Sequence, residues 1–78
     1  MESSKVLKGF RAKRLLSQDD LANKINVSRQ MYNIYENNLL KCEFDLVFKI
    51  LNAIAVDETE LLQFLNALKQ DYMSYDGN

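Results

Sequence analysis

The chain has 78 residues, enough for one small domain with a single hydrophobic core. Hydrophobic residues make up 47% and charged residues 27% of the sequence, a balance that excludes a disordered chain. The formal net charge is −1, histidine is missing and Cys42 is the single cysteine, so the sequence excludes an internal disulfide, and we expect no metal and no cofactor.

The charges are unevenly distributed along the chain. Residues 1–39 carry seven Lys and Arg against four Asp and Glu, whereas residues 40–78 carry three against seven. Such a chain can turn a basic face toward a polyanion, although two ordinary solvated surfaces would give the same counts. No apolar stretch reaches the ~18–20 residues that span a bilayer, and the first residues do not resemble a signal peptide. We therefore expect a cytoplasmic protein without a membrane partner.

Apolar residues recur at helical spacing along the chain, without strand-like alternation, proline or hairpin turns. This pattern predicts an all-α fold, a compact cluster of five helices. The first helix is expected to begin with Ser3 or Ser4 as N-cap and to run to about Leu15.

The next two predicted helices are short and closely spaced. Ser17 is the expected N-cap of a helix over residues 18–25, whose first turn is acidic. Asn26 can adopt the left-handed conformation that ends a helix without glycine. Ser28 is the expected N-cap of a helix that runs to about Asn37. The pattern predicts two helices joined by a tight turn.

A loop over residues 37–42 precedes the fourth predicted helix, over residues 43–54. Its core stripe has apolar residues at spacings of three and four: Phe44, Val47, Phe48, Leu51 and Ile54. Asp57 and Glu60 have capping-box spacing at the start of a fifth helix, which is expected to reach Tyr72 or Tyr75. Residues 1–78 then form a single domain, with its core at about 4–62 and a C-terminal helix extension at about 63–75.

Residues 18–37, with the sequence QDDLANKINVSRQMYNIYEN, form the predicted helix-turn-helix. Over about residues 5–62 the chain resembles the lambda-repressor/Cro-like helix-turn-helix proteins, also called the XRE family. Matching pairs lie within the motif, at Leu21-Ala22 and Tyr35-Glu36, and on either side of it, at Phe10-Arg11 and Ala53-Ile54. The resemblance implies a five-helix domain that binds operator DNA as a dimer, in a bacterial or phage repressor or Cro-like switch protein. It also implies a partly buried structural ion pair between Arg11 and Glu36.

Residues near the start of a recognition helix reach base edges in the major groove. Arg29 can donate to guanine, and Gln30 can pair with adenine or serve guanine. Asn33 suits a base or a phosphate, and Ile34 a thymine methyl. The resemblance implies that Gln18 contacts a phosphate with its side chain or backbone N–H. The candidate DNA-binding residues are Gln18, Ser28, Arg29, Gln30, Asn33, Ile34, Asn37, Asn38 and Lys41, with Lys13 or Arg14 as additions that ordinary solvation explains better.

The chain departs from the family pattern at several positions. Asn26 and Asn38 stand where the family usually has glycine, and both tolerate the left-handed conformation. Leu39 and Leu40 stand where the family usually has polar or basic residues. These leucines either fold back onto the core or mark a surface for a partner.

The fifth helix carries an apolar stripe that outruns the usual family domain. From Leu61 it continues with heptad-like spacing through Leu65, Leu68, Tyr72 and Tyr75. We interpret the stripe as a homodimer interface, ahead of simple capping within one chain. The alternative function is a protein-interaction module, or an antitoxin-like protein, that binds a second protein through Leu39, Leu40 and the C-terminal helix.

The sequence shows no catalytic constellation. Histidine, a glycine-rich phosphate loop and a metal-ligand cluster are missing, and Cys42 has no evident base to activate it. We therefore expect no enzyme, and no small-molecule ligand is evident.

Overall fold

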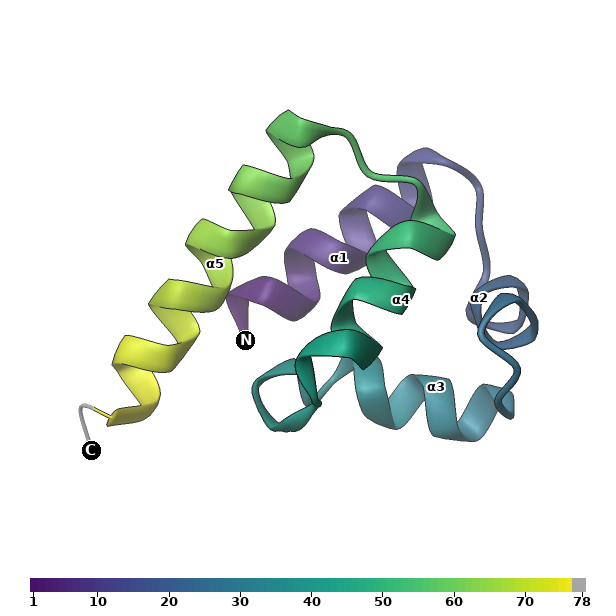
Figure 1. The fold of residues 1–78 in the computed structure, drawn as a ribbon, viewed down its shortest axis with the longest axis horizontal. Coiled ribbons are helices and arrows are strands. Elements are labelled where there is room, and N and C mark those ends of the chain that lie inside the picture. Colours follow the sequence, from purple (N-terminus) through teal and green to yellow (C-terminus); the bar gives the residue numbers. More distant parts are fainter. Residues whose placement is uncertain (77–78) are drawn as a thin grey trace.

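The computed structural model describes the backbone of residues 1–76 and the side chains of residues 1–74. Over residues 1–76 it has five α-helices, one 3₁₀ helix and no strand (Figure 1): α1 (Glu2–Lys13), α2 (Gln18–Lys24), α3 (Arg29–Glu36), η1 (Leu39–Lys41), α4 (Phe44–Ile54) and α5 (Glu58–Asp76). The predicted all-α fold with five helices is confirmed. None of these described helices is both long and apolar enough to cross a membrane.

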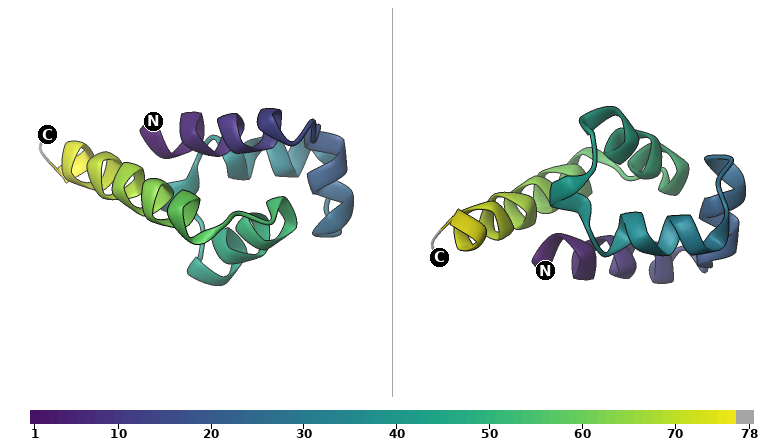
Figure 2. Two further views of the ribbon diagram at one scale, coloured as in Figure 1. Left: turned by 90° about the horizontal axis from the view of Figure 1, so that it is seen from above. Right: turned by 90° about the horizontal axis from the view of Figure 1, so that it is seen from below.

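The helices pack around one hydrophobic core. α1 and α5 lie side by side, α2 and α3 form a closely packed pair, and α4 contacts α2 (Figures 1 and 2). Every element contributes to the core, which includes Leu7, Phe10, Leu21, Ala22, Tyr32, Leu39, Val47, Ile50, Leu51, Ile54 and Phe64. In Figure 1 α3 runs along the lower edge of the molecule, so one side of this helix faces the core and the other faces solvent.

The start of α1 differs from the prediction. Ser3 and Ser4 lie inside the helix and are buried, so neither is its N-cap. The Asp71 carboxylate of α5 instead accepts hydrogen bonds from the backbone N–H groups of Glu2 and Ser3, at 2.6 and 2.8 Å, and from the Ser3 hydroxyl. The Ser4 hydroxyl donates to the backbone carbonyl of Glu36. A residue distant in sequence therefore satisfies the free N–H groups that a local cap would otherwise bind.

α1, α2 and α4 end through the same type of turn. Leu15, Asn26 and Ala55 have φ values of 56°, 61° and 64°. The next residue in each case donates its N–H to the carbonyl five residues before it, as in a Schellman motif: Leu16 to Arg11, Val27 to Ala22, and Val56 to Leu51. The prediction for Asn26 is confirmed. For Asn38 it is wrong, because η1 begins directly after this residue, whose φ is −139° and whose side chain donates to the carbonyl of Ile34.

The buried face of α4 is not the predicted one. Val47, Leu51 and Ile54 are buried as expected, but Phe44 and Phe48 are 66% and 42% exposed. Ile50 is buried instead, so the core stripe follows positions 47, 50, 51 and 54. The two phenylalanine rings contact each other, with centroids 5.2 Å apart. Apolar residues cover more than one side of this helix, so the sequence was compatible with either stripe.

The loop after α3 packs one of its leucines into the core. Leu39 is 2% exposed, and Leu40 is half-buried. The interpretation of Leu39 as part of a partner surface is therefore wrong. Its side chain is covered by its own domain because η1 turns it inward.

α5 begins with the predicted capping box. The N–H of Glu60 donates to Asp57 Oδ1 at 2.8 Å, and the N–H of Asp57 donates to Glu60 Oε1 at 2.9 Å. The helix then packs on the domain well beyond residue 62, because Phe64, Ala67 and Asp71 are all buried. The C-terminal extension is therefore part of the packed fold at least as far as Asp71.

The stripe predicted as a dimer interface lies beside this buried face of α5. Leu68 is half-buried, whereas Leu65 and Tyr72 are exposed. The side chain of Tyr75 lies outside the described residues. Three stripe residues, Leu65, Leu68 and Tyr72, line a groove of about 380 Å³ between α4 and α5, together with Leu40 and Phe44.

Candidate nucleic-acid interface

The α2–α3 pair is built from local signals in the sequence. Ser17 caps α2 as predicted, since its hydroxyl accepts the N–H of Asp20 at 3.0 Å while the Asp20 carboxylate accepts the N–H of Ser17 at 2.8 Å. The hydrogen bond from the backbone N–H of Ser17, followed by the Ser17 side chain, lowers the pKa of Asp20. Ser28 caps α3, and its hydroxyl accepts the N–H of Met31 at 3.1 Å. The N-termini of both helices are thus fixed by short-range hydrogen bonds.

α3 has a buried side and a solvent-exposed side. Tyr32 and Glu36 face the interior. The exposed residues include Arg29 and Gln30 in the first turn, and none of the described side chains forms a hydrogen bond or ion pair with either of them. Further candidates share this exposed side: Ser28, Asn33, Ile34 and Asn37. The start of α3 therefore offers a guanidinium and an amide to a ligand outside the molecule.

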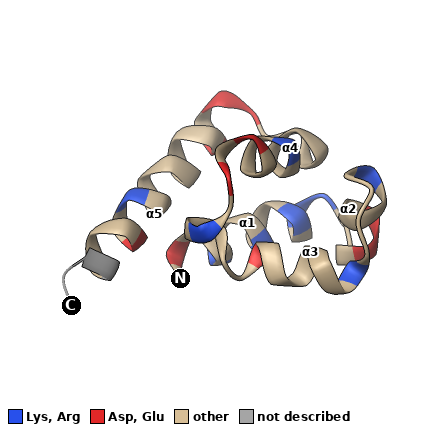
Figure 3. Ribbon diagram, turned by 60° about the horizontal axis from the view of Figure 1, so that its bottom comes forward, with Lys and Arg blue, Asp and Glu red and all other residues tan. Residues whose placement is uncertain are grey.

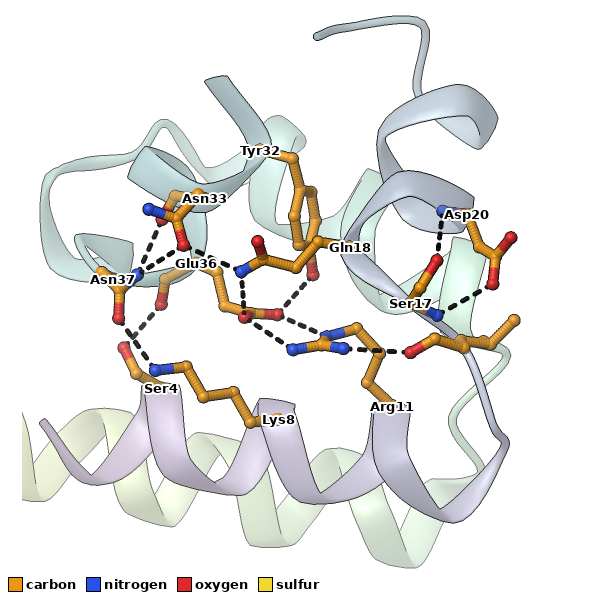
Figure 4. Close-up of polar contacts among 11 residues, drawn as sticks. Ser4, Lys8, Arg11, Ser17, Gln18, Asp20, Tyr32, Asn33, Glu36 and Asn37 are labelled. Carbon is orange, nitrogen blue, oxygen red and sulfur yellow. Dashed lines mark hydrogen bonds and ion pairs between the residues drawn. The ribbon is translucent and has the colours of Figure 1, made fainter. Parts of the chain in front are cut away.

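Glu36 anchors α3 to the two preceding helices. The residue is fully buried, at 0% exposure. Arg11 donates to both of its carboxylate oxygens, from Nε at 2.9 Å and from Nη2 at 3.0 Å. The Tyr32 hydroxyl donates at 2.7 Å and Gln18 Nε2 at 3.1 Å (Figure 4). The ion pair that the resemblance implied is therefore present, with α2 joined to it.

The protonation states of this cluster follow from its hydrogen bonds. Burial alone would raise the pKa of Glu36, but the hydrogen bonds from Arg11, Tyr32 and Gln18 outweigh it and lower that pKa. The hydrogen bond to Glu36 is the main cause that raises the pKa of Arg11. Burial, followed by the bond to Glu36, raises the pKa of Tyr32. At neutral pH the carboxylate is therefore charged and surrounded by donors.

A chain of side-chain amides extends from Glu36 across the exposed side of α3. Gln18 Nε2 also donates to Asn33 Oδ1 at 2.9 Å. Asn37 Nδ2 donates to the backbone carbonyl of Asn33 at 2.9 Å and to its Oδ1 at 3.3 Å. Lys8 Nζ of α1 donates to Asn37 Oδ1 at 2.9 Å (Figure 4). The amide nitrogen of Gln18 is thus occupied within the protein, which favours a positioning role for this side chain over the expected phosphate contact.

Lys8 is a candidate that the sequence interpretation missed. Its ammonium group lies at the end of α3, next to Asn37. The signal was its position on α1, because residues 4, 8 and 11 share the side of that helix that contacts α3. Recognising this spacing required knowing that Arg11 faces Glu36.

The remaining basic candidates are divided between two surfaces. Lys41 is exposed at the end of η1, close to the end of α3. Lys13 and Arg14 instead pair with the Glu60 carboxylate of α5, Lys13 at 3.3 Å and Arg14 Nη1 at 3.0 Å. These two residues therefore join α1 to α5, and their cationic groups bind the Glu60 carboxylate where a phosphate contact was the alternative.

The charge of the exposed surface on α3 is small but positive. α3 carries only Arg29 and Glu36 as charged residues, so its ribbon is almost entirely tan in Figure 3. Glu36 is neutralised by Arg11, and Arg29, Lys8 and Lys41 lie around this surface. A hollow beside Ile34 and Lys41 adds one more cation, Lys49, and two carboxylates, Glu43 and Asp45, so the positive charges exceed the negative ones by a small number. Among the described residues no cluster of Cys, Asp and Glu is arranged to hold a metal ion. A small positive charge around the exposed side of α3 would allow this helix to bind against a polyanion.

A comparison with protein-family models matches residues 7–61 to the family described as helix-turn-helix. The match covers well over half of the 78 residues and contains α2, α3, the Arg11–Glu36 pair and α4. The comparisons with curated proteins and with solved structures gave no significant match. This match shows that the chain belongs to the lambda-repressor/Cro-like (XRE) helix-turn-helix family of DNA-binding regulators.

Proposed function

We propose that the protein is a sequence-specific transcriptional repressor that binds operator DNA in the major groove as a homodimer. Occupying an operator needs no catalysis, because it excludes polymerase from the promoter. The observation that carries the proposal is the exposure of Arg29 and Gln30 in the first turn of α3, without partners among the described side chains. Residues at this point of a recognition helix meet base edges.

The proposed contacts have different roles. Arg29 and Gln30 read bases, Ile34 contacts a thymine methyl, and Asn33 also faces the bases. Ser28, Asn38 and Lys41 contact the phosphate backbone at the two ends of α3, together with Lys8. The amide of Asn37, a further candidate, is already bonded to Asn33 and Lys8, which favours a positioning role for it. Phosphate contacts fix the register of the helix, and base contacts set the preferred sequence.

The apolar surface between α4 and α5 supports the homodimer. Leu65, Tyr72 and Phe44 are exposed and line one groove, and the exposed ring of Phe48 lies against Phe44. Operators read by this motif are two-fold symmetric, and the two recognition helices of a dimer enter major grooves about 34 Å apart. A second copy of the chain is therefore the occupant that fits both the surface and the function.

Selection from random duplex DNA tests the DNA-binding proposal. We expect an inverted-repeat consensus, and Arg29→Ala should weaken binding to it by about 1–3 kcal/mol, roughly 5- to 150-fold. Lys5→Ala is the matched control, because Lys5 is an exposed cation of α1 whose ion pair with Glu2 is long, at 3.6 Å. Equal losses for both variants, or no enrichment of any sequence, would contradict the proposal.

Sedimentation equilibrium tests the dimer separately. Leu65→Glu should shift the protein toward monomer, because it places a charge in the apolar groove. Gln70→Glu, an exposed position on the polar side of the same helix, should leave the association constant unchanged. A wild-type protein that stays monomeric on its operator would exclude the homodimer.

A partner protein remains the alternative occupant of the α4–α5 surface. Leu39 no longer supports it, since this side chain is in the core. A monomer whose DNA binding is normal but which binds a second protein through Leu65 and Phe44 would favour that alternative.

A further inference from the structure

Asn33 lies in a hydrogen-bonding chain whose orientation is fixed at both ends. At one end, the ionised Glu36 carboxylate only accepts hydrogen bonds, so the Gln18 atom that faces it must be the amide nitrogen. That nitrogen also faces the Asn33 side chain, at 2.9 Å. The atom of Asn33 at this contact must then be the oxygen, because two amide nitrogens would both be donors.

The other end of this hydrogen-bonding series, at Lys8, fixes the Asn33 amide in the same orientation independently. Lys8 carries an ammonium group, which only donates, so the Asn37 atom that faces it must be the oxygen. The nitrogen of Asn37 then faces the backbone carbonyl and the side-chain oxygen of Asn33, at 2.9 and 3.3 Å. Rotating the Asn33 amide by half a turn would replace both contacts of its oxygen with donor–donor contacts. The side chain is therefore held in one orientation.

This orientation determines what Asn33 can offer to DNA. Its oxygen has two lone pairs, and Gln18 and Asn37 each occupy one of them. Its nitrogen lies on the side away from Gln18 (Figure 4), and no described residue accepts a hydrogen bond from it. A free asparagine can pair with adenine by donating to N7 and accepting from N6, but Asn33 has no lone pair left for N6.

We propose that Asn33 is preset as a donor and therefore selects guanine over adenine, with Gln18 and Asn37 as its positioning residues. Guanine presents two neighbouring acceptors, N7 and O6, between which the amide nitrogen can share its donation, whereas thymine presents a single acceptor, O4. Adenine places its N6 donor, and cytosine its N4 donor, against the Asn33 donor. The expected order at the contacted position is guanine, thymine, then adenine and cytosine. This inference rests on the proposed DNA-binding function and specifies the operator that the function requires.

The test begins with the consensus selected by the full-length wild-type protein. Each position is replaced by the other bases in both half-sites, and relative affinities are measured by competition fluorescence anisotropy for the wild type and for Asn33→Ala. The position at which Asn33→Ala loses base preference is the Asn33 contact. We expect the wild type to prefer guanine there over adenine by about tenfold, the effect of one good base contact.

Two variants distinguish a role in orienting the Asn33 amide from an effect on folding stability. Gln18→Met removes one donor and Asn37→Ala the other, so each frees a lone pair on Asn33 for adenine N6. In each variant the affinity for guanine should exceed that for adenine at this position by only about twofold, while the base preferences at the Arg29 contact stay unchanged. Because Gln18 also bonds to Glu36, Gln18→Met can lose stability, but Asn37→Ala leaves every hydrogen bond to the Glu36 carboxylate intact.

The outcomes distinguish this inference from the function itself. A wild-type preference for adenine or cytosine, no position that responds to Asn33→Ala, or an unchanged preference for guanine over adenine in folded Asn37→Ala would each overturn the inference and leave DNA binding established. Absence of any selected sequence would instead remove the proposed function. A guanine preference that weakens in both variants would support the donor assignment.

Discussion

Replacing Arg11 with methionine should remove a large part of the domain's stability. The substitution keeps the length of the side chain but leaves the fully buried Glu36 carboxylate without its cation. Breaking a buried ion pair from one side costs about 3–5 kcal/mol, because the remaining charge stays desolvated. A hydrogen bond from Arg11 Nη1 to the carbonyl of Leu16, 3.0 Å long, is lost as well and adds about 1 kcal/mol.

The expected loss of stability is large compared with the total free energy of unfolding of so small a domain. At about 0.05–0.15 kcal/mol per residue, a chain of this length has a free energy of unfolding of roughly 4–12 kcal/mol. Urea unfolding at pH 7, followed by circular dichroism, should therefore show Arg11→Met at or near the edge of folding. Lys13→Met is the matched control, because the Lys13 side chain is 70% exposed in its pair with Glu60 and should contribute less than about 1 kcal/mol.

The pH dependence identifies the group responsible. In the wild type the pKa of Glu36 is lowered, so its contribution to stability is complete above the unfolded pKa of about 4.3 and is lost as the pH falls through the lower folded pKa. In Arg11→Met the effect of burial is less opposed, so protonation of Glu36 should relieve the penalty. The difference in the free energy of unfolding between the wild type and Arg11→Met should then become smaller as the pH falls from 7 to 4. A loss below about 1 kcal/mol, or a difference that does not change with pH, would refute this reasoning.

Three further predictions follow from other parts of the fold. Asp71→Ala should lower the free energy of unfolding by about 2–3 kcal/mol in urea, because it leaves the buried donors of Ser3 without an acceptor; an unchanged value would mean that α5 does not cap α1. Ala55→Gly should raise the stability by about 1 kcal/mol, since Ala55 has a φ of 64°, whereas Ala53→Gly within α4 should lower it by a similar amount; the same sign for both would contradict this account. The hydrogen bond from Arg14 is the main cause that lowers the pKa of Glu60 to about 2. The contribution of ionised Glu60 to stability is therefore complete above about pH 4.3 and should be lost as the pH falls toward 2. Glu60→Gln should make the melting temperature less dependent on pH over this range, and an unchanged dependence would contradict the assignment.

The sequence predicted those features that depend on neighbours along the chain. Ser17 and Ser28 cap α2 and α3 through residues three positions away, and Asn26 ends α2 in the conformation that asparagine tolerates. Leu15 and Ala55 adopt the same conformation without any such preference. Their strain is accepted because the residues that follow them, Leu16 and Val56, pack against the core. That gain depends on tertiary packing and has no local signal.

Features that depend on distant parts of the chain were not predictable in the same way. The cap of α1 comes from Asp71, and the exposed pair Phe44 and Phe48 on α4 reflects which of two apolar stripes meets the core. In the candidate site, the exposure of Arg29 followed from its place after an N-cap. The role of Lys8 required the relative placement of α1 and α3, which local periodicity does not contain.

The carboxylate of Asp71 also links the two ends of the described fold. The first amides of a helix usually exchange their hydrogens with water quickly, because they fray without a partner. Here the amides of Glu2 and Ser3 are bonded to a side chain 69 and 68 residues away, so they exchange only when α5 detaches from α1. The amides of the first turn of α1 are thus reporters of opening of the α1–α5 contact.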